Sequence, residues 1–214
     1  MTLGTLFLGK VKSLNNQFIE TKFFAIGIPI YPVSSIYVTE KNYNQRLGLA
    51  LPLNKTSVIA GYMRFYIGAL AVFCLLEGEL LIFAMGISPV NHTLFILLKY
   101  LLVAIFILIW AYFMFYFGKS TKAETDLRNK VGKVTGYYIV PSWFDHGFCL
   151  EIYDQYAKRY KEMKPNGDWR KDISTLSYAD NDLSIYYVLS LFNYVTEPND
   201  ESYKLFEKAD GMFN

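Results

Sequence analysis

Four charged side chains lie inside the two longest apolar stretches of the chain: Arg64 near the start of the first stretch, and three that lie deeper. Glu77 and Glu79 interrupt the stretch over residues 58–90, and Lys99 interrupts the stretch over residues 93–118. An unpaired charge at the centre of a bilayer costs at least ~2.5–3.5 kcal/mol, so such residues usually face partners rather than lipid. In this setting, carboxylates and an ammonium group can form an ion pair or pass a proton or cation along a relay.

The spacing of these charges places two of them at the same depth. If the turn between the stretches is centred on Pro89, Glu79 lies ten residues before it and Lys99 ten residues after it. At a rise of 1.5 Å per residue, both lie ~15 Å from the turn, near the middle of the bilayer. We therefore predict an ion pair between Glu79 and Lys99 that fixes how the two arms pack.

Two other interpretations of these charges stay open. A proton or cation relay through Glu77, Glu79 and Lys99 would need several copies of the chain, because one helical hairpin cannot enclose a pathway. Alternatively, the first helix is shorter and ends near Leu76, which leaves both glutamates at the membrane interface.

A transmembrane helical hairpin over residues 55–118 is the element predicted to position these charges. Its helices are expected over about 57–86 and 93–117. Both exceed the ~20 residues that an α-helix needs to cross a bilayer. The lipid bilayer is therefore an expected partner of this chain.

Basic residues flank the hairpin at one end only. Arg64 is expected to anchor the hairpin at the lipid headgroups. Lys119 and Lys122 follow the second helix, and the flank continues with Arg128, Lys130 and Lys133. The turn between the helices has no Lys or Arg. Because Lys and Arg favour the cytoplasmic side, both termini are predicted to be cytoplasmic.

Residues 1–54 are predicted to form a small antiparallel β module. Residues 18–24 alternate apolar and polar side chains, which is typical of a strand with one buried face. Gly27, Pro29 and Pro32 are expected to interrupt the chain before the next strand. Short strands are expected over residues 5–12, 18–24, 35–39 and 47–53, with turns at Asn15–Asn16 and over residues 43–46.

Residues 119–214 are predicted to form a helical cytosolic module. One of its helices has an apolar face made by residues that recur every four positions, namely Phe148, Ile152, Tyr156 and Tyr160. Asp145 is predicted to cap the start of this helix, and residues 165–167 to end it. Two more helices are expected, from about residue 182 to residue 195 and after Pro198.

Composition and motifs argue against several other classes of protein. A net charge of +2 does not provide the basic surface of a nucleic-acid-binding protein. We find no glycine-rich phosphate loop and no histidine pair spaced for a metal, so no metal or cofactor is expected. Asp145 and His146 beside Cys149 come nearest to a catalytic arrangement, but Asp145 is better explained as a helix cap. Cys74 and Cys149 are expected to be buried and unpaired.

One segment resembles a known group of proteins. Residues 19–38 read Ile-Glu-Thr-Lys-Phe-Phe-Ala-Ile-Gly-Ile-Pro-Ile-Tyr-Pro-Val-Ser-Ser-Ile-Tyr-Val. This segment resembles the N-terminal signature of an uncharacterised group of bacterial membrane proteins, in which Thr-Lys-x-Phe precedes Ile-Pro-x-x-Pro and a β-branched strand. The resemblance implies a bacterial membrane setting and no particular activity.

These observations predict an α+β membrane protein with a small N-terminal antiparallel β module, a two-helix transmembrane hairpin and a C-terminal helical cytosolic module. Its expected function is non-enzymatic, as an accessory or interaction subunit in the bacterial cytoplasmic membrane. The expected protein partner is another membrane protein or a second copy of the chain. The alternatives are a small oligomeric channel or transporter component and a membrane-tethered enzyme built on the C-terminal module.

Overall fold

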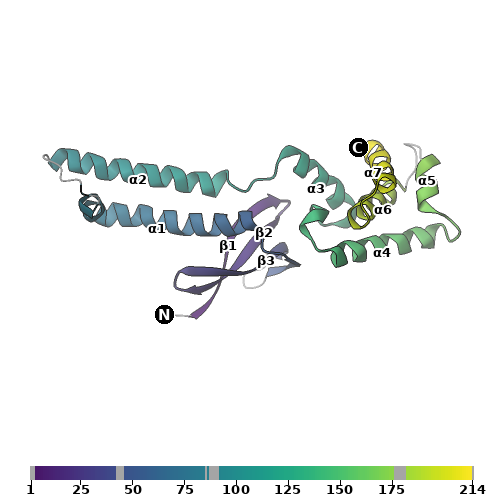
Figure 1. Cartoon of the computed structure of the whole chain (residues 1–214), viewed down its shortest axis with the longest axis horizontal. Coiled ribbons are helices and arrows are strands. Elements are labelled where there is room, and N and C mark those ends of the chain that lie inside the picture. Colours follow the sequence, from purple (N-terminus) through teal and green to yellow (C-terminus); the bar gives the residue numbers. More distant parts are fainter. Residues whose placement is uncertain (1–2, 42–45, 85, 87–91, 176–181, 214) are drawn as a thin grey trace. The chain divides into compact units, whose positions relative to one another are not determined.

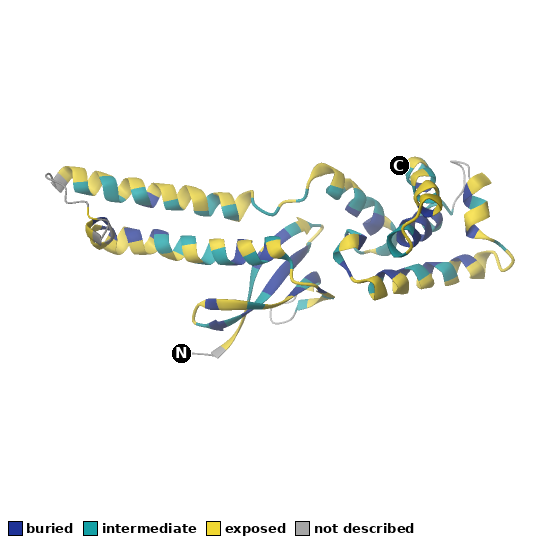
Figure 2. Ribbon diagram, viewed as in Figure 1, coloured by how far each residue is buried: buried dark blue, intermediate teal, exposed yellow. Residues whose placement is uncertain are grey.

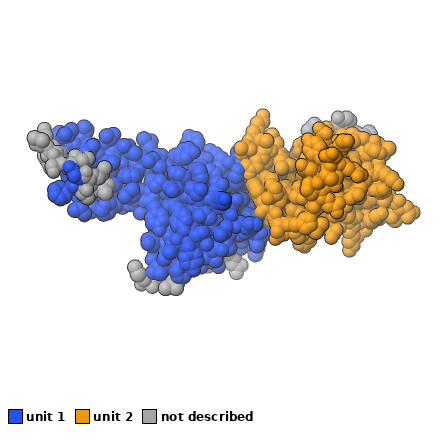
Figure 3. Space-filling view, viewed as in Figure 1, with its two compact units in different colours: residues 1–120 blue, residues 121–214 orange. Residues whose placement is uncertain are grey.

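The fold of this chain is α+β. The computed structural model describes residues 3–41, 46–84, 86, 92–175 and 182–213. Within them lie one four-stranded antiparallel sheet, seven α-helices and a short 3₁₀ helix. Residues 1–120 form one compact unit and residues 121–214 form another (Figure 3). The sheet and the apolar helices share the first unit, so the predicted boundary near residue 54 does not separate two compact units.

The sheet is an antiparallel meander. Its strands are β1 (Leu3–Leu14), β2 (Gln17–Ile26), β3 (Pro29–Lys41) and β4 (Arg46–Leu51), and they lie in that order in space. As predicted, Asn15 and Asn16 form the first turn, with the positive φ values of 48° and 63° that a tight two-residue hairpin favours. The predicted turn over residues 43–46 lies outside the described residues apart from Arg46, which begins β4.

The third strand is longer than predicted, and the expectation that prolines keep it from starting before residue 35 was wrong. β3 begins at Pro29 and continues through Pro32. Proline cannot donate to a sheet ladder, so it is confined to edge strands, strand starts and bulges. Pro29 is the first residue of β3, and the register of the sheet shifts at Phe23 and Ala25, which lie opposite the two prolines.

Two long apolar helices follow the sheet. α1 (Lys55–Ala84) and α2 (His92–Phe115) lie side by side (Figure 1) and begin and end within two residues of the predicted bounds. Both are long and apolar enough to cross a membrane. In the described part of α2, Val103 alone is buried (Figure 2). A helix that is apolar on all sides and not covered by its own chain is typical of a membrane span.

The first of these helices bends at Glu77, so the prediction of one continuous helix was wrong at this point. At Glu77 the backbone has φ −122° and ψ 26°, outside the helical range. The next residue is Gly78, and glycine is a weak helix former that often accompanies a kink. The bend falls one residue after Leu76, where the alternative of a shorter helix placed its end.

The sheet packs on the first half of α1 through buried hydroxyl groups. Ser57 Oγ donates to the Gly9 carbonyl at 2.7 Å and accepts from Thr21 Oγ1 at 2.8 Å. Ser35 Oγ lies 2.9 Å from Thr21 Oγ1. Gly9 has φ +76°, and a Cβ added there would lie only 1.9 Å from the Ser57 carbonyl oxygen. The sheet can therefore approach the helix this closely only with glycine at this position.

The second compact unit is helical, as predicted. Its elements are α3 (Lys122–Thr135), η1 (Pro141–Trp143), α4 (His146–Met163), α5 (Trp169–Thr175), α6 (Leu183–Thr196) and α7 (Asp200–Met212). The core is α6, in which every residue over 186–193 is buried (Figure 2). Asp145 caps α4 as predicted, because its Oδ1 accepts from the Phe148 N–H at 2.8 Å.

One basic residue assigned to the membrane flank is a core residue of this unit. Arg128 is fully buried, and its Nε donates to the Tyr138 carbonyl at 2.6 Å. Its guanidinium lies 5.1 Å from the centroid of the Trp143 ring. Such a cation over an aromatic face is favourable when both are removed from water. Arg128 therefore stabilises the helical unit and is not part of a basic surface flank.

Candidate functional site

The first part of the candidate site is a junction of α1, α2 and β1 around Arg64. Arg64 donates from Nε to the Phe113 carbonyl at 2.8 Å and from Nη1 to the Lys10 carbonyl at 2.6 Å. In the opposite direction, Trp110 Nε1 donates to the Arg64 carbonyl at 2.9 Å. One arginine and one tryptophan thus join three segments that are far apart in the sequence.

The end of α2 explains why a cation lies at this junction. The last four carbonyls of a helix lack partners within the helix. The Phe117 N–H bonds the Tyr112 carbonyl, which leaves the Phe113 carbonyl for Arg64. A cation at this end also interacts favourably with the helix dipole. A second role of Arg64 as a headgroup anchor stays a prediction.

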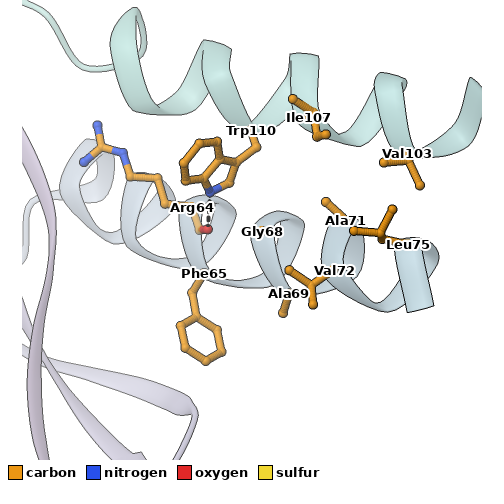
Figure 4. A pocket seen from close by; sticks show the side chains of 10 residues that line it. All are labelled: Arg64, Phe65, Gly68, Ala69, Ala71, Val72, Leu75, Val103, Ile107 and Trp110. Carbon is orange, nitrogen blue, oxygen red and sulfur yellow. Dashed lines mark hydrogen bonds between the residues drawn. The ribbon is translucent and has the colours of Figure 1, made fainter. Parts of the chain in front are cut away.

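Next to this junction, an open apolar groove of about 800 Å³ lies between α1 and α2 (Figure 4). Its lining is Arg64, Phe65, Gly68, Ala69, Ala71, Val72, Leu75, Val103, Ile107 and Trp110. Gly68 lets the indole of Trp110 lie against α1, since a Cβ added at Gly68 would come within 2.8 Å of Trp110 Nε1. Ala71 is buried and forms part of the floor. Small residues of this kind let transmembrane helices approach one another closely.

The three charges singled out from the sequence lie beyond the groove. The side chain of Lys99 packs against Gly78, where an added Cβ would lie 2.9 Å from Lys99 Cγ. Lys99 thus packs against the residue that precedes its expected partner, Glu79. Glu77 and Glu79 are exposed, and in the part of the chain that the structure describes no ion pair within 4 Å joins either of them to Lys99. A direct ion pair therefore stays a prediction.

The two lysines that follow α2 lie in different compact units. Lys119 is exposed, and its Nζ lies 5.0 Å from the centroid of the Tyr116 ring. The segment before it is fixed to the sheet, because the Lys12 N–H donates to the Gly118 carbonyl at 2.7 Å. Lys122 is the exposed first residue of α3, in the second unit. Contact of either lysine with headgroups stays a prediction.

A polar cluster that the sequence did not reveal joins α4, α5 and α6. Asp172 Oδ2 accepts from Tyr160 OH at 2.9 Å, from Lys164 Nζ at 2.9 Å and from Tyr186 OH at 3.0 Å. The hydrogen bond from Lys164 lowers the pKa of Asp172, and burial raises the pKa of both tyrosines. The carboxylate is thus a weak base and the phenols stay protonated, as expected of a structural cluster. The tyrosines occupy apolar positions in the helical pattern, so nothing in it marks them as partners of a carboxylate.

The residues nearest to a catalytic arrangement do not form an activated thiol. Cys149 is buried, and its Sγ donates to the Pro141 carbonyl at 3.5 Å. Burial, aided by the charge of Asp145, raises the pKa of Cys149 to about 11, whereas a nucleophilic cysteine needs a lowered pKa. His146 is exposed. Among the described residues, no cluster of three His, Cys, Asp or Glu side chains could hold a metal ion.

Comparison with known proteins adds no assignment to this geometry. No family model, no curated protein and no solved structure matches the chain.

Proposed function

We propose that this protein is an integral-membrane accessory subunit, inserted through the α1–α2 hairpin, that receives a transmembrane partner in the groove between the two helices. The groove supports the proposal most directly, because its floor of small residues lies between two helices that are otherwise apolar on the outside. Gly68 and Ala71 are the residue types that transmembrane interfaces favour. The partner is a second copy of the chain or another membrane protein.

The position of the bilayer in this proposal follows from the sheet. An open sheet has unpaired edge groups, and such edges do not occur in lipid-exposed hydrocarbon. The sheet-covered part of α1, residues 57–66, therefore lies above the hydrocarbon core or at its upper boundary, and that boundary lies between Arg64 and Tyr66. From Phe113, which bonds Arg64, back to Thr93, α2 runs for about 20 residues or ~30 Å, the thickness of that core.

This position moves the three charges away from the bilayer centre. Lys99 lies six residues from Thr93, or ~9 Å from the far end of the core. A lysine at this depth can extend its ammonium group to the interface along its apolar stem. Glu77 and Glu79 lie beside it, at the bend. The alternative with both glutamates near the interface thus fits better than a central ion pair.

The test is native purification with a variant that fills the groove. The full-length protein, extracted directly into lipid nanodiscs, is expected to carry a stoichiometric partner or a second copy. Ala71→Leu puts a large side chain on the groove floor and should release that partner while the chain stays inserted. Leu108→Phe is the matched control, because Leu108 is 70% exposed and lies outside the groove lining. A wild-type protein that is monomeric and without a partner would refute the proposal.

The bend at Glu77 supports a second candidate function. It leaves two exposed carboxylates in an apolar helix, next to a lysine on the other arm. An oligomer could bring such groups together as a cation or proton path. In proteoliposomes, this function requires an ion flux that Glu77→Gln, Glu79→Gln or Lys99→Met reduces. The absence of any flux, or a flux that all three variants retain, would exclude it.

A further inference from the structure

The turn between β2 and β3 carries an apolar patch that no described part of its unit covers. Ile28, Ile30, Tyr31 and Val33 are between 44% and 53% exposed. The chain has no charged residue between Lys22 and Glu40. Single exposed apolar residues are ordinary, but a contiguous patch of them marks an interaction surface. We call residues 27–33 the tip.

Two tyrosines of α1 fix the height of the tip along the helix. Tyr62 OH donates to the Ile30 carbonyl at 2.8 Å, and Tyr66 OH donates to the Pro29 carbonyl at 2.7 Å. The sheet contacts α1 at Ser57, then near Gly61 and Tyr62, and at the tip near Tyr66. The tip therefore points the way α1 runs (Figure 1), and reaches just past Arg64.

Three consecutive backbone carbonyls of the tip are already paired within the protein. The Ile28 carbonyl accepts from the Ile26 N–H at 3.1 Å, and the tyrosines occupy the Pro29 and Ile30 carbonyls. Pro29 and Pro32 have no N–H to satisfy. A loop exposed to water does not need partners for its carbonyls within the protein, because water can donate hydrogen bonds to them. A loop at the acyl boundary does need such partners, since lipid tails offer no hydrogen bonds.

We propose that the tip inserts into the lipid interface of the bilayer that the hairpin crosses, as a second attachment beside the two helices. The inference rests on the proposed insertion of the hairpin, which puts Tyr66 at the top of the hydrocarbon core. Lipid is the occupant that fits, because Tyr66 makes the tip patch continuous with the lipid-facing surface of α1. Tyr31 adds an aromatic ring of the kind that is enriched at membrane interfaces.

The experiment places an environment-sensitive fluorophore at single cysteines of the full chain in which Cys74 and Cys149 are replaced by alanine. Val33 and Ile28 report on the tip, Leu108 on the lipid face of α2, and Ser13 on the opposite end of the sheet. Each labelled protein is placed in phosphatidylcholine–phosphatidylglycerol nanodiscs. A lipid spin-labelled near the top of its acyl chain quenches from the membrane, and iodide quenches from water.

The tip labels are expected to behave like the Leu108 label, losing most of their emission to the spin-labelled lipid and little to iodide. The Ser13 label should show the reverse. If the Leu108 label is quenched by lipid while both tip labels are quenched by iodide, the tip lies in water and the inference fails alone. If neither quencher reaches the tip labels, protein covers the tip, which also overturns the inference. A Leu108 label that lipid does not quench would refute hairpin insertion itself, and both proposals with it.

Discussion

Gly9 is expected to decide whether the sheet stays packed on α1. Substitutions of Gly9, Gly27 and Gly4 separate two possible causes, the left-handed backbone and the close approach to Ser57. Gly9 has φ +76° and a backbone neighbour 1.9 Å from the place of an added Cβ. Gly27 has φ +74° with nothing within 4 Å, and Gly4 has neither constraint. Gly4→Ala is therefore the control for the change from glycine to alanine itself, and Gly27→Ala isolates the cost of the left-handed backbone.

The expected magnitudes follow from these environments. A left-handed backbone costs an alanine roughly 1–2 kcal/mol, which is the whole effect expected for Gly27→Ala. Gly9→Ala has the same cost and must also move the helix backbone away. This breaks the bond between Ser57 Oγ and the Gly9 carbonyl, and a buried acceptor left without its partner costs about 1–3 kcal/mol. The sum for Gly9→Ala is about 2–5 kcal/mol, and the value for Gly4→Ala lies near zero.

Hydrogen exchange of the β2 amides in nanodiscs measures this difference as a free energy of local opening. Because each 1.4 kcal/mol is about tenfold, exchange should be roughly tenfold faster in Gly27→Ala and about 30-fold or more faster in Gly9→Ala. The amides of α2 should exchange as in the wild type, which shows that the hairpin itself is intact. If Gly9→Ala exchanges no faster than Gly27→Ala, close contact at Ser57 is not what holds the sheet to the helix.

Three further predictions concern the junction and the second unit. Trp110→Phe removes the hydrogen bond to the Arg64 carbonyl and should destabilise the hairpin by about 1 kcal/mol in a detergent unfolding titration. The pKa of Asp172 is lowered in the folded protein by Lys164, so its contribution to stability is complete above the ordinary carboxyl pKa and is lost as the pH falls through the lowered value. Thermal unfolding of the second unit should show this loss at acid pH, and Asp172→Asn should abolish it. Cys149, with its pKa raised to about 11, should resist alkylation at pH 8 until the unit is unfolded.

The parts of the fold that sequence could predict are those set by one dominant force. The two long helices were predicted because each apolar stretch is long enough to cross a bilayer and no turn interrupts it, and both lie within two residues of the expected bounds. The first sheet turn was found because Asn15 and Asn16 tolerate positive φ. In these cases the preference of the residues themselves agrees with the conformation that they adopt in the folded protein.

The errors arose where tertiary packing decides. Pro29 and Pro32 read as chain breakers, yet register shifts in the neighbouring strand let both lie in β3. Arg128 was interpreted as a surface charge. The sequence around it does not show that the Trp143 ring and the Tyr138 carbonyl, from a later segment, contact its guanidinium group. Nor did the bend at Glu77 follow from composition, because a glycine permits a kink without requiring one.

The same limit applies to the candidate site. Arg64 was found as a charge in an apolar stretch, but its bonds to Phe113 and Lys10 depend on where a second helix ends and where a strand crosses it. Gly68 carried no signal of its own, since its role appears only when Trp110 of α2 lies over it. Gly68 and Ala71, two small residues one helical turn apart, are the signal that could have indicated close helix packing here.

The packing of the sheet on α1 changes how the charges inside the apolar stretches are interpreted. In the proposed bilayer position, with the sheet at the membrane surface, Arg64 lies at one face of the hydrocarbon core, and its guanidinium donates to the Lys10 carbonyl of β1. Lys99 lies fourteen residues from Phe113 along α2, ~21 Å deeper and toward the other face. Two cations that reach opposite faces oppose movement of the hairpin in either direction, because any shift pulls one of them into hydrocarbon. In the proposed bilayer position, Arg64 and Lys99 therefore set the depth of both spans.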